Sequence, residues 1–261
     1  MRGILLEITS LFKNIFFVNK LGTGIILNRR ADPNGICLSE KIEAQICGIK
    51  IATKNTEDGI EMLKKADESL CQVQRILHKM NELAVQCASG TYSKEQRAEY
   101  NKVFHDYKEK VNYIGLKSLY NGISIFDPSK NPNIDNDDYT IKLQIGADAG
   151  DIIKIKIEPM NIAILGLANS FIVTQEDSRK SINNVLKSID MISNRRIEIS
   201  NTQIKLREII ENQNTIIENL MNAKNGVVNK NVTINELKKN LAMNNKFSYN
   251  VAPLMKEKNA N

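Results

Sequence analysis

The chain has 261 residues, of which 25% are charged and only 5% aromatic, with no Trp and 5 Pro. This composition favours long helices over a sandwich of short strands, which needs many turn residues. The net charge of +6 is modest and spread along the chain, so we interpret basic clusters as solvated helix faces and expect no nucleic-acid partner. No uninterrupted apolar run reaches about 18 residues, and we expect no membrane insertion.

The first 32 residues carry an amphipathic pattern. Apolar residues recur at helical spacing: Ile4, Leu5, Ile8, Leu11, Phe12 and Ile15. The basic start is typical of a signal peptide, but Glu7 and Lys13 interrupt the apolar run and no small-residue cleavage site follows. We therefore predict a terminal helix that stays on the mature protein, and export without a cleaved signal peptide.

From about Leu38 to Ala88 the pattern predicts one long helix. The stripe shifts once by one residue, as a 3.6-residue helix does against a 3.5-residue repeat. Its members are Ile42, Ile46, Ile49, Thr53, Thr56, Ile60, Leu63, Ala66, Leu70, Val73, Leu77, Met80, Ala84 and Cys87. A helix of about 50 residues is about 75 Å long, too long for an ordinary globular core.

The sequence has four cysteines, and three of them lie on this predicted helix. Cys47, Cys71 and Cys87 would then be separated by tens of Å, whereas a disulfide requires Cα atoms within about 7 Å. We expect them, like Cys37, to be reduced and mostly to pack as small apolar side chains.

A shorter helix and a β-hairpin follow. Ser93 stands three residues before Gln96, a capping-box spacing that predicts a helix start. Asn121-Gly122 predicts a tight turn. Residues 139–159 alternate apolar and polar positions in two runs joined by a Gly-rich turn, and this pattern predicts a hairpin with one buried face.

Thr174 and Asp177 predict the cap of a second long helix, which we expect to extend to about Asn225 and to end at Gly226. The tail resumes an apolar stripe from Ile234 to Leu254. The predicted fold is mainly α, a long antiparallel helical coiled-coil or bundle rod with a small β-hairpin. We expect terminal helices at 1–32 and 226–261 and a long-helix core at 33–225. The predicted subunit-packing residues are Ile42, Ile46, Ile60, Leu63, Leu70, Leu77, Ile189, Ile209, Ile216 and Leu220.

No pattern in the sequence indicates catalysis. The two histidines, His78 and His105, lie inside helical patterns and are interpreted as surface residues. The acidic run 135–138 lacks the ligand spacing of a calcium loop and is interpreted as solvated. We expect neither an enzyme nor a bound cofactor or metal.

Six segments, in order along residues 20–225, resemble motifs of the bacterial flagellins. NRRADPNG (28–35) resembles RINSAADDAAG, LSEK (38–41) resembles LAISEKM, and NTEDGI (55–60) resembles NAQDGIS. NELAVQ (81–86) resembles RELAVQ, LYNG (119–122) resembles the FNG turn, and LQIGADAGD (143–151) resembles LQIGANAGQ. The resemblance implies a short, divergent flagellin with only the inner D0 and D1 domains, the variable outer domains being absent between Asp127 and Tyr139.

That resemblance implies a secreted structural subunit that polymerises with itself or other flagellins into the extracellular filament used for motility. It also implies passage through the flagellar export machinery with a secretion chaperone. Residues 225–234 keep little of the family's SRIRDxDMA motif, and the INxN-type opening is absent. Two alternatives from the same family therefore stay open, a non-polymerising paralogue and a hook–filament junction protein. A third alternative is a coiled-coil binding module, or a basic tail that binds anionic surfaces.

The resemblance also implies a recognition patch for the innate immune receptor TLR5 at Lys79, Glu82 and Leu83. The family has Arg where this chain has Lys79, and Lys lacks the bidentate fork of Arg. The acidic contact expected on the next helix falls on Val103. We expect weak recognition; the alternative is that these residues serve packing only.

Overall fold

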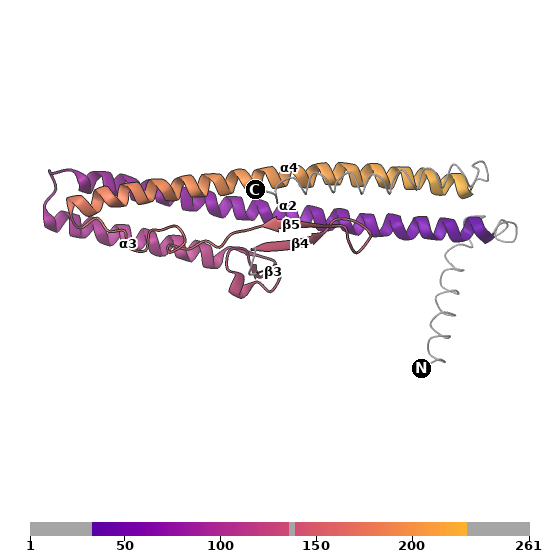
Figure 1. Cartoon of the computed structure of the whole chain (residues 1–261), viewed down its shortest axis with the longest axis horizontal. Coiled ribbons are helices and arrows are strands. Elements are labelled where there is room, and N and C mark those ends of the chain that lie inside the picture. Colours follow the sequence, from indigo (N-terminus) through magenta and orange to yellow (C-terminus); the bar gives the residue numbers. More distant parts are fainter. Residues whose placement is uncertain (1–32, 136–138, 229–261) are drawn as a thin grey trace, which may run out of the picture. The chain divides into compact units, whose positions relative to one another are not determined.

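The structure is a computed structural model that describes residues 33–135 and 139–228, with side chains for 37–135 and 139–225 (Figure 1). The elements in chain order are α2 (Pro33–Ala88), α3 (Lys94–Lys117), β1 (Leu119–Tyr120), β2 (Ile123–Ser124), the 3₁₀ helix η2 (Pro128–Lys130), β3 (Ile134–Asp135), β4 (Thr140–Gln144), β5 (Ile152–Lys156) and α4 (Gln175–Val228). The prediction of a mainly α fold with long helices and a small hairpin is confirmed. Within the described ranges, no helix is long and apolar enough to cross a membrane.

The chain divides into two compact units, which are described separately. One is Ile49–Asn214, and the other combines residues up to Gly48 with those from Thr215 onward. The predicted terminal helices at 1–32 and 226–261 lie almost entirely outside the described residues. The predicted boundaries at 32/33 and 225/226 therefore stay predictions.

In the unit 49–214, α2 and α4 run antiparallel. Arg196 binds Asp67, and Ser193 of α4 accepts a hydrogen bond from Gln74 of α2. Nearer the start of α2, Thr56 Oγ1 accepts a hydrogen bond at 3.5 Å from Nε2 of Gln213, which comes later in α4 than Ser193 and Arg196. In the other unit, Lys224 Nζ lies 2.6 Å from Glu43 Oε2.

The buried stripe of α2 differs from the predicted one at three positions. From Ala52 onward it follows steps of four and three without a shift, with Ser69 buried beside it: Ala52, Thr56, Gly59, Leu63, Ala66, Leu70, Val73, Leu77, Met80, Ala84 and Cys87. The predicted Ile49, Thr53 and Ile60 are only half-buried. Gly59 replaces Ile60 because β4 approaches closely there, and a Cβ on Gly59 would lie 2.7 Å from Leu143 Cδ2.

The helix starts predicted at Ser93 and Thr174 are confirmed, whereas the first long helix, predicted from about Leu38, already includes Pro33. Ser93 accepts a hydrogen bond from Gln96 N at 3.2 Å, and Gln96 Oε1 accepts one from Ser93 N at 2.9 Å. Thr174 Oγ1 accepts a hydrogen bond from Asp177 N at 3.0 Å. The predicted end at Gly226 is wrong, because α4 includes Gly226 and reaches Val228, the last described residue. A glycine commonly ends a helix by adopting the left-handed conformation itself, and Gly226 is helical instead.

Side chains from the other two long helices cap the end of α2. The buried Arg97 of α3 donates from Nε to Cys87 O at 2.8 Å and from Nη2 to Ser89 O at 2.7 Å. Gln175 of α4 donates to Ala88 O at 2.9 Å. Carbonyls at a helix end have no partner within the helix, so these three bonds fix where α2, α3 and α4 meet.

The predicted hairpin is confirmed as β4–β5, and β3 extends it to a three-stranded antiparallel sheet. A two-residue strand such as β3 carries no readable alternation, so the sequence did not predict it. β1 and β2 form a second, minimal hairpin, in which Asn121 and Gly122 have φ values of 50° and 80°. Two positive φ values are typical of the tight turn that Asn-Gly predicts.

An irregular segment between β5 and α4 is held by polar side chains from both flanking helices. From α3, Lys108 Nζ donates to Ala168 O at 3.0 Å, and Asn101 and Asn112 accept from backbone N–H groups of the segment. Lys108 also lies 4.6 Å from the ring centroid of Phe171, and burial lowers its pKa. From α4, Ser181 and Ser188 donate to backbone carbonyls. These bonds satisfy backbone groups that have no sheet partner.

A small ion-pair network joins the end of β5 to α4. Glu158 accepts from Lys156 at 2.7 Å and from Arg195 at 2.9 Å, and Arg195 also donates to Pro159 O. The hydrogen bond from Lys156, followed by the charge of Arg195, lowers the pKa of Glu158 against the opposing effect of burial.

We predict that Gly115→Ala destabilises the fold. A Cβ on Gly115 would overlap the carbonyl oxygen of Met160, a backbone atom that cannot move alone. The expected loss in the free energy of unfolding is about 1–3 kcal/mol, measured by urea denaturation followed by circular dichroism. Gly59→Ala is the matched control, since its nearest neighbour is the end of a flexible Leu143 side chain, and it should cost less. Equal stability of Gly115→Ala and the parent chain would contradict this close approach.

We also predict a pH-dependent effect of Glu158→Gln. Because the folded state lowers the pKa of Glu158, its contribution to stability is present at neutral pH and is lost as the pH falls through the folded pKa. The variant should therefore unfold at lower urea concentration at pH 7, and the difference should shrink as the pH falls below about 4. A difference that is constant with pH would show that the ionised carboxylate is not responsible.

Candidate functional site: the faces of the long helices

Most of the predicted packing residues lie inside the chain's own core. Eight are buried and two, Ile60 and Ile216, are half-buried; the buried ones are Ile42, Ile46, Leu63, Leu70, Leu77, Ile189, Ile209 and Leu220. They therefore stabilise the folded chain itself. Their role in contacts between subunits stays a prediction.

A different set of apolar residues on α4 is exposed to solvent. Leu186, Ile197 and Ile204 are 45%, 58% and 49% exposed. Their spacings of 11 and 7 residues place them within about 20° of one another around the helix. Sequence reasoning missed this exposed stripe (Leu186, Ile197, Ile204) because α4 carries apolar residues on two faces. The sequence pattern identified only the other face, which carries Ile189, Ile209, Ile216 and Leu220.

A hydrogen-bonded ion pair fixes the register of α4 against α2 beside this stripe. Arg196 contacts Asp67 with Nε to Oδ1 at 2.7 Å and Nη2 to Oδ2 at 3.3 Å, a bidentate arrangement. Arg196 Nη1 also donates to Gln74 Oε1 at 2.8 Å. The bonds to Asp67 raise the pKa of Arg196, so this guanidinium stays charged throughout the ordinary pH range. Side chains from two elements are thus held in one relative position.

The residues of the predicted receptor patch lie on α2 and α3. Lys79 and Glu82 are exposed and Leu83 is half-buried. Val103 of α3, where an acidic residue was expected, is 41% exposed. The two charged residues are available to a partner, and Val103 presents an apolar side chain in place of a carboxylate.

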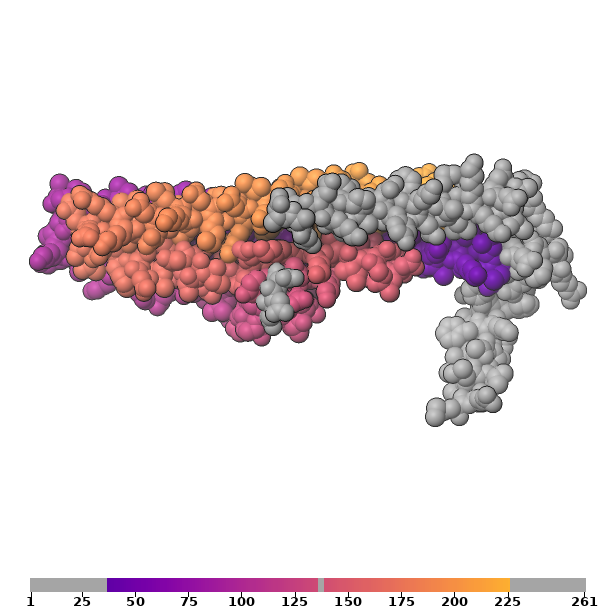
Figure 2. All heavy atoms as spheres, viewed as in Figure 1, coloured from indigo at the N-terminus to yellow at the C-terminus, as the bar shows by residue number. Residues whose placement is uncertain are grey.

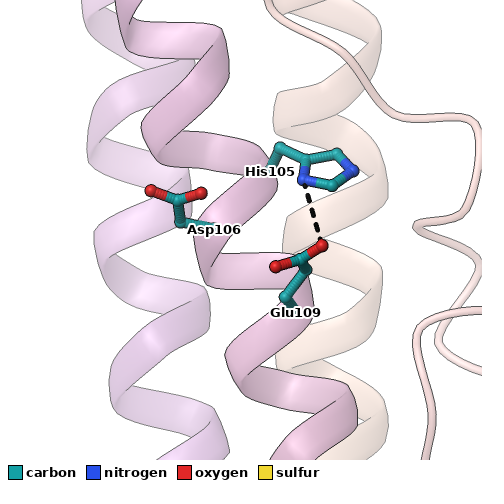
Figure 3. Close-up of side chains that lie close together, drawn as sticks. All are labelled: His105, Asp106 and Glu109. Atoms are coloured by element: carbon teal, nitrogen blue, oxygen red, sulfur yellow. Dashed lines mark ion pairs between the residues drawn. The ribbon is translucent and has the colours of Figure 1, made fainter.

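One cluster of potential metal ligands occurs in the described ranges, on α3 (Figure 3). His105 Nδ1 lies 3.7 Å from Glu109 Oε1, and Asp106 is the neighbouring residue. All three are exposed and come from little more than one helical turn. This geometry is that of a surface pair one turn apart, and we assign it no metal. His78 is likewise exposed; residues 136–138 of the acidic run lie outside the described residues.

All four cysteines are free. Cys37 and Cys47 are exposed, Cys71 is half-buried and Cys87 is buried. Burial raises the pKa of the Cys87 thiol. Cys87 thus packs as the small apolar residue that its helical position predicts, and burial makes its thiol unreactive. The expected apolar packing is wrong for Cys37 and Cys47, which are exposed.

Comparison with known proteins finds similarity to bacterial flagellins. Residues 17–131 match the sequence model of the bacterial flagellin N-terminal helical region. The flagellin of Halalkalibacterium halodurans is 28% identical over 213 residues, which span 80% of this chain and 75% of that protein.

Two solved structures share the fold. The crystal structure of Bacillus cereus flagellin matches with a TM-score of 0.54 and 22% identity, over 61% of this chain and 88% of that one. A flagellar hook-associated protein from Vibrio parahaemolyticus matches with a TM-score of 0.63 and 12% identity, over 76% of this chain and 99% of that one. The arrangement of helices is thus common to both kinds of flagellar protein, whereas the sequence similarity is to flagellins. This chain thus resembles the bacterial flagellins in sequence along four fifths of its length, and it shares their fold.

Proposed function

We propose that this chain is a structural subunit of the flagellar filament outside the cell, and that it polymerises with itself or with other flagellins for motility. The observation that carries the proposal is its similarity to flagellins along four fifths of the chain, including the match to their N-terminal helical region. Flagellins are structural proteins, and the proposed role requires no catalytic residue.

The exposed stripe of α4 supplies a physical reason for association. Leu186, Ile197 and Ile204 remain in water after the core has formed. Covering apolar surface stabilises a complex by about 25 cal/mol per Å², and in a polymer every subunit repeats the contact. Apolar side chains spaced along one line of a long helix can pack against a helix of a neighbouring subunit, which also presents a long, narrow surface.

The alternative of a hook–filament junction protein is not favoured. The fold is compatible with it, but the sequence relatives are flagellins. A non-polymerising paralogue rests on the departures at 225–234, most of which lie outside the described residues. These two alternatives differ from the proposal in whether the chain elongates a filament.

Export is proposed through the flagellar type III machinery with a dedicated secretion chaperone. The support is the sequence similarity to flagellins, because that resemblance implies this export route. The chaperone would protect the exposed stripe of α4, or the amphipathic terminal segments of the sequence, from association before export.

We predict that purified full-length chain elongates sheared flagellar filaments. The seeds should be incubated with monomer under reducing conditions, because Cys37 and Cys47 are exposed, then sedimented and imaged by electron microscopy. Growth from seeds is the expected result. Folded helical monomer that never enters the pellet would contradict the filament role.

A variant tests the exposed stripe in the same assay. Ile197→Lys with Ile204→Lys should abolish elongation without loss of helical signal, because two charges would be buried at each repeat of the contact. Asn194→Lys with Asn212→Lys is the matched control on exposed positions of the same helix. If the chain fails to elongate, exchanging its tail from Gly226 onward for that of a typical flagellin shows whether the altered motif is the cause.

We also propose weak recognition by TLR5 through Lys79, Glu82 and Leu83. Recognition is supported by the exposure of Lys79 and Glu82. We expect it to be weak because Lys79 stands where the family has Arg, and Val103 stands where the family has an acidic residue.

We predict that Lys79→Arg with Val103→Glu raises receptor signalling by about tenfold in a reporter-cell titration. A restored bidentate arginine and a charged contact together contribute about 1.4 kcal/mol or more. Lys79→Ala should lower the parent signal further. An unchanged dose response for both variants would mean that the patch serves packing only.

A further inference from the structure

The solvent-facing side of the β4–β5 hairpin carries two lysines directly opposite each other. Lys142 pairs with Lys154 in the antiparallel register. Both are exposed, whereas Ile153 and Ile155, which alternate with them, are buried. Figure 2 shows the β4–β5 region at the surface of the molecule. Neither ammonium forms an ion pair or hydrogen bond with a described residue, although the neighbouring Lys156 binds Glu158.

This arrangement is unfavourable in an isolated chain. Like charges directly opposite on antiparallel strands destabilise the pair, because their side chains lie about 5 Å apart. A carboxylate of a partner between the two ammonium groups would attract both and offset their mutual repulsion. Ile152, two residues from Lys154 on the same face, is 41% exposed and adds an apolar contact. We call Lys142, Ile152 and Lys154 the hairpin face.

The chain carries a matching face on α3. Glu95, Glu99, Asp106 and Glu109 are all exposed and, at 100° per residue, lie within about 80° of one another around the helix. Tyr113, in line with them, is 64% exposed. Three exposed lysines lie near these residues: Lys102 among the carboxylates, Lys110 about 20° outside their range, and Lys117 one turn beyond Tyr113. His105 pairs with Glu109. Four carboxylates still outnumber the single lysine that lies between them. We call Glu99, Asp106, Glu109 and Tyr113 the α3 face, part of which appears in Figure 3.

The two faces match in spacing as well as in charge. Ile152 and Lys154 are two residues apart on a strand, a step of about 6.6 Å. Tyr113 and Glu109 are four residues apart on a helix, a step of about 6 Å. An aromatic ring can therefore cover Ile152 while a carboxylate one turn away meets Lys154.

One molecule presents both faces at different places along α2. Within the unit 49–214, α3 lies beside the later part of α2, where Arg97 binds Cys87 O and Ser118 donates to Ser69. The hairpin lies beside the earlier part, where Asn55 donates to Gln144 O (Figure 1). Contact between unlike faces is heterologous, and such contacts repeat without closing when the rotation between copies is not that of a ring.

We propose that the hairpin face of one copy docks on the α3 face of a second copy. This inference rests on the proposed function and deepens it, because it names a contact that propagates the filament. Contacts between charged faces mainly accelerate association and select the correct partner, and salt weakens them.

Exchange of charge between the two faces provides the test. One variant carries Lys142→Glu with Lys154→Glu, and the other carries Glu99→Lys with Asp106→Lys. In each variant alone the two faces have the same sign, so seeded elongation at about 0.01 M salt, where the Debye length is about 30 Å, should slow by about tenfold or more. In an equimolar mixture each face again meets its opposite, and elongation should return to within about twofold of the parent rate. Lys187→Glu with Lys205→Glu, on exposed positions of α4, is the control for the change in net charge.

The outcomes separate this inference from the proposed function. If the parent chain elongates and both charge-reversed variants elongate at the parent rate, the docking is overturned and the filament role stands. The same conclusion follows if the variants elongate slowly and their equimolar mixture does not regain the parent rate. A parent chain that never elongates would overturn the filament role. The docking is then decided by sedimentation velocity of unseeded full-length chain at low salt. Self-association that both variants lose and their mixture regains supports it, and its absence overturns it. Circular dichroism confirms in each case that the variants are folded.

Discussion

The apolar seam between α2 and α4 within residues 49–214 is the contact on which the other elements depend. A helix of this length is not stable in water through its own hydrogen bonds and requires a packed face. Leu63, Leu70 and Leu77 of α2 and Ile192 and Leu206 of α4 supply that face and are fully buried. The bidentate pair of Arg196 and Asp67 then sets the register, because apolar packing alone would tolerate a shift by one heptad. The third layer, made of α3, the sheet and the irregular segment, can be placed only after this register is set.

Many of the large apolar side chains of α2 and α4 are buried between these two helices, and this burial limits which residues can contact another copy. Residues buried in the seam are not available to a neighbour, so contacts between copies must use what the seam leaves outside. That remainder includes the exposed stripe of α4 and charged faces such as those of the hairpin and α3. With the contacts proposed above, stability of the subunit and growth of the filament depend on separate residues. A substitution in the seam should affect both, whereas one on a face should affect growth alone.

The sequence predicts the parts of the fold that follow from local rules. Ser93 and Thr174 start helices because a side-chain oxygen can accept from a nearby backbone N–H, and Asn121-Gly122 turns the chain because both residues tolerate positive φ. What the sequence does not predict depends on partners distant in the chain. Gly59 is buried in place of Ile60 because a strand more than 80 residues later packs against it. Lys108 and Asn101 read as surface residues of an amphipathic helix, yet they hold an irregular segment whose path no periodicity reveals.

The low sequence identity between this chain and known flagellins is consistent with different residues serving folding and assembly. The fold requires an apolar period, a few caps and a few close approaches such as Gly115 against Met160, and many sequences satisfy these requirements. Charges on the faces are free of that constraint and can change whenever the partner changes with them. In a homopolymer the partner is the same sequence, so a change on one face is compensated by a change on another face of the same chain. Opposed lysines on a hairpin lower the stability of the isolated fold, and they persist most readily where a carboxylate of a neighbouring copy lies against them.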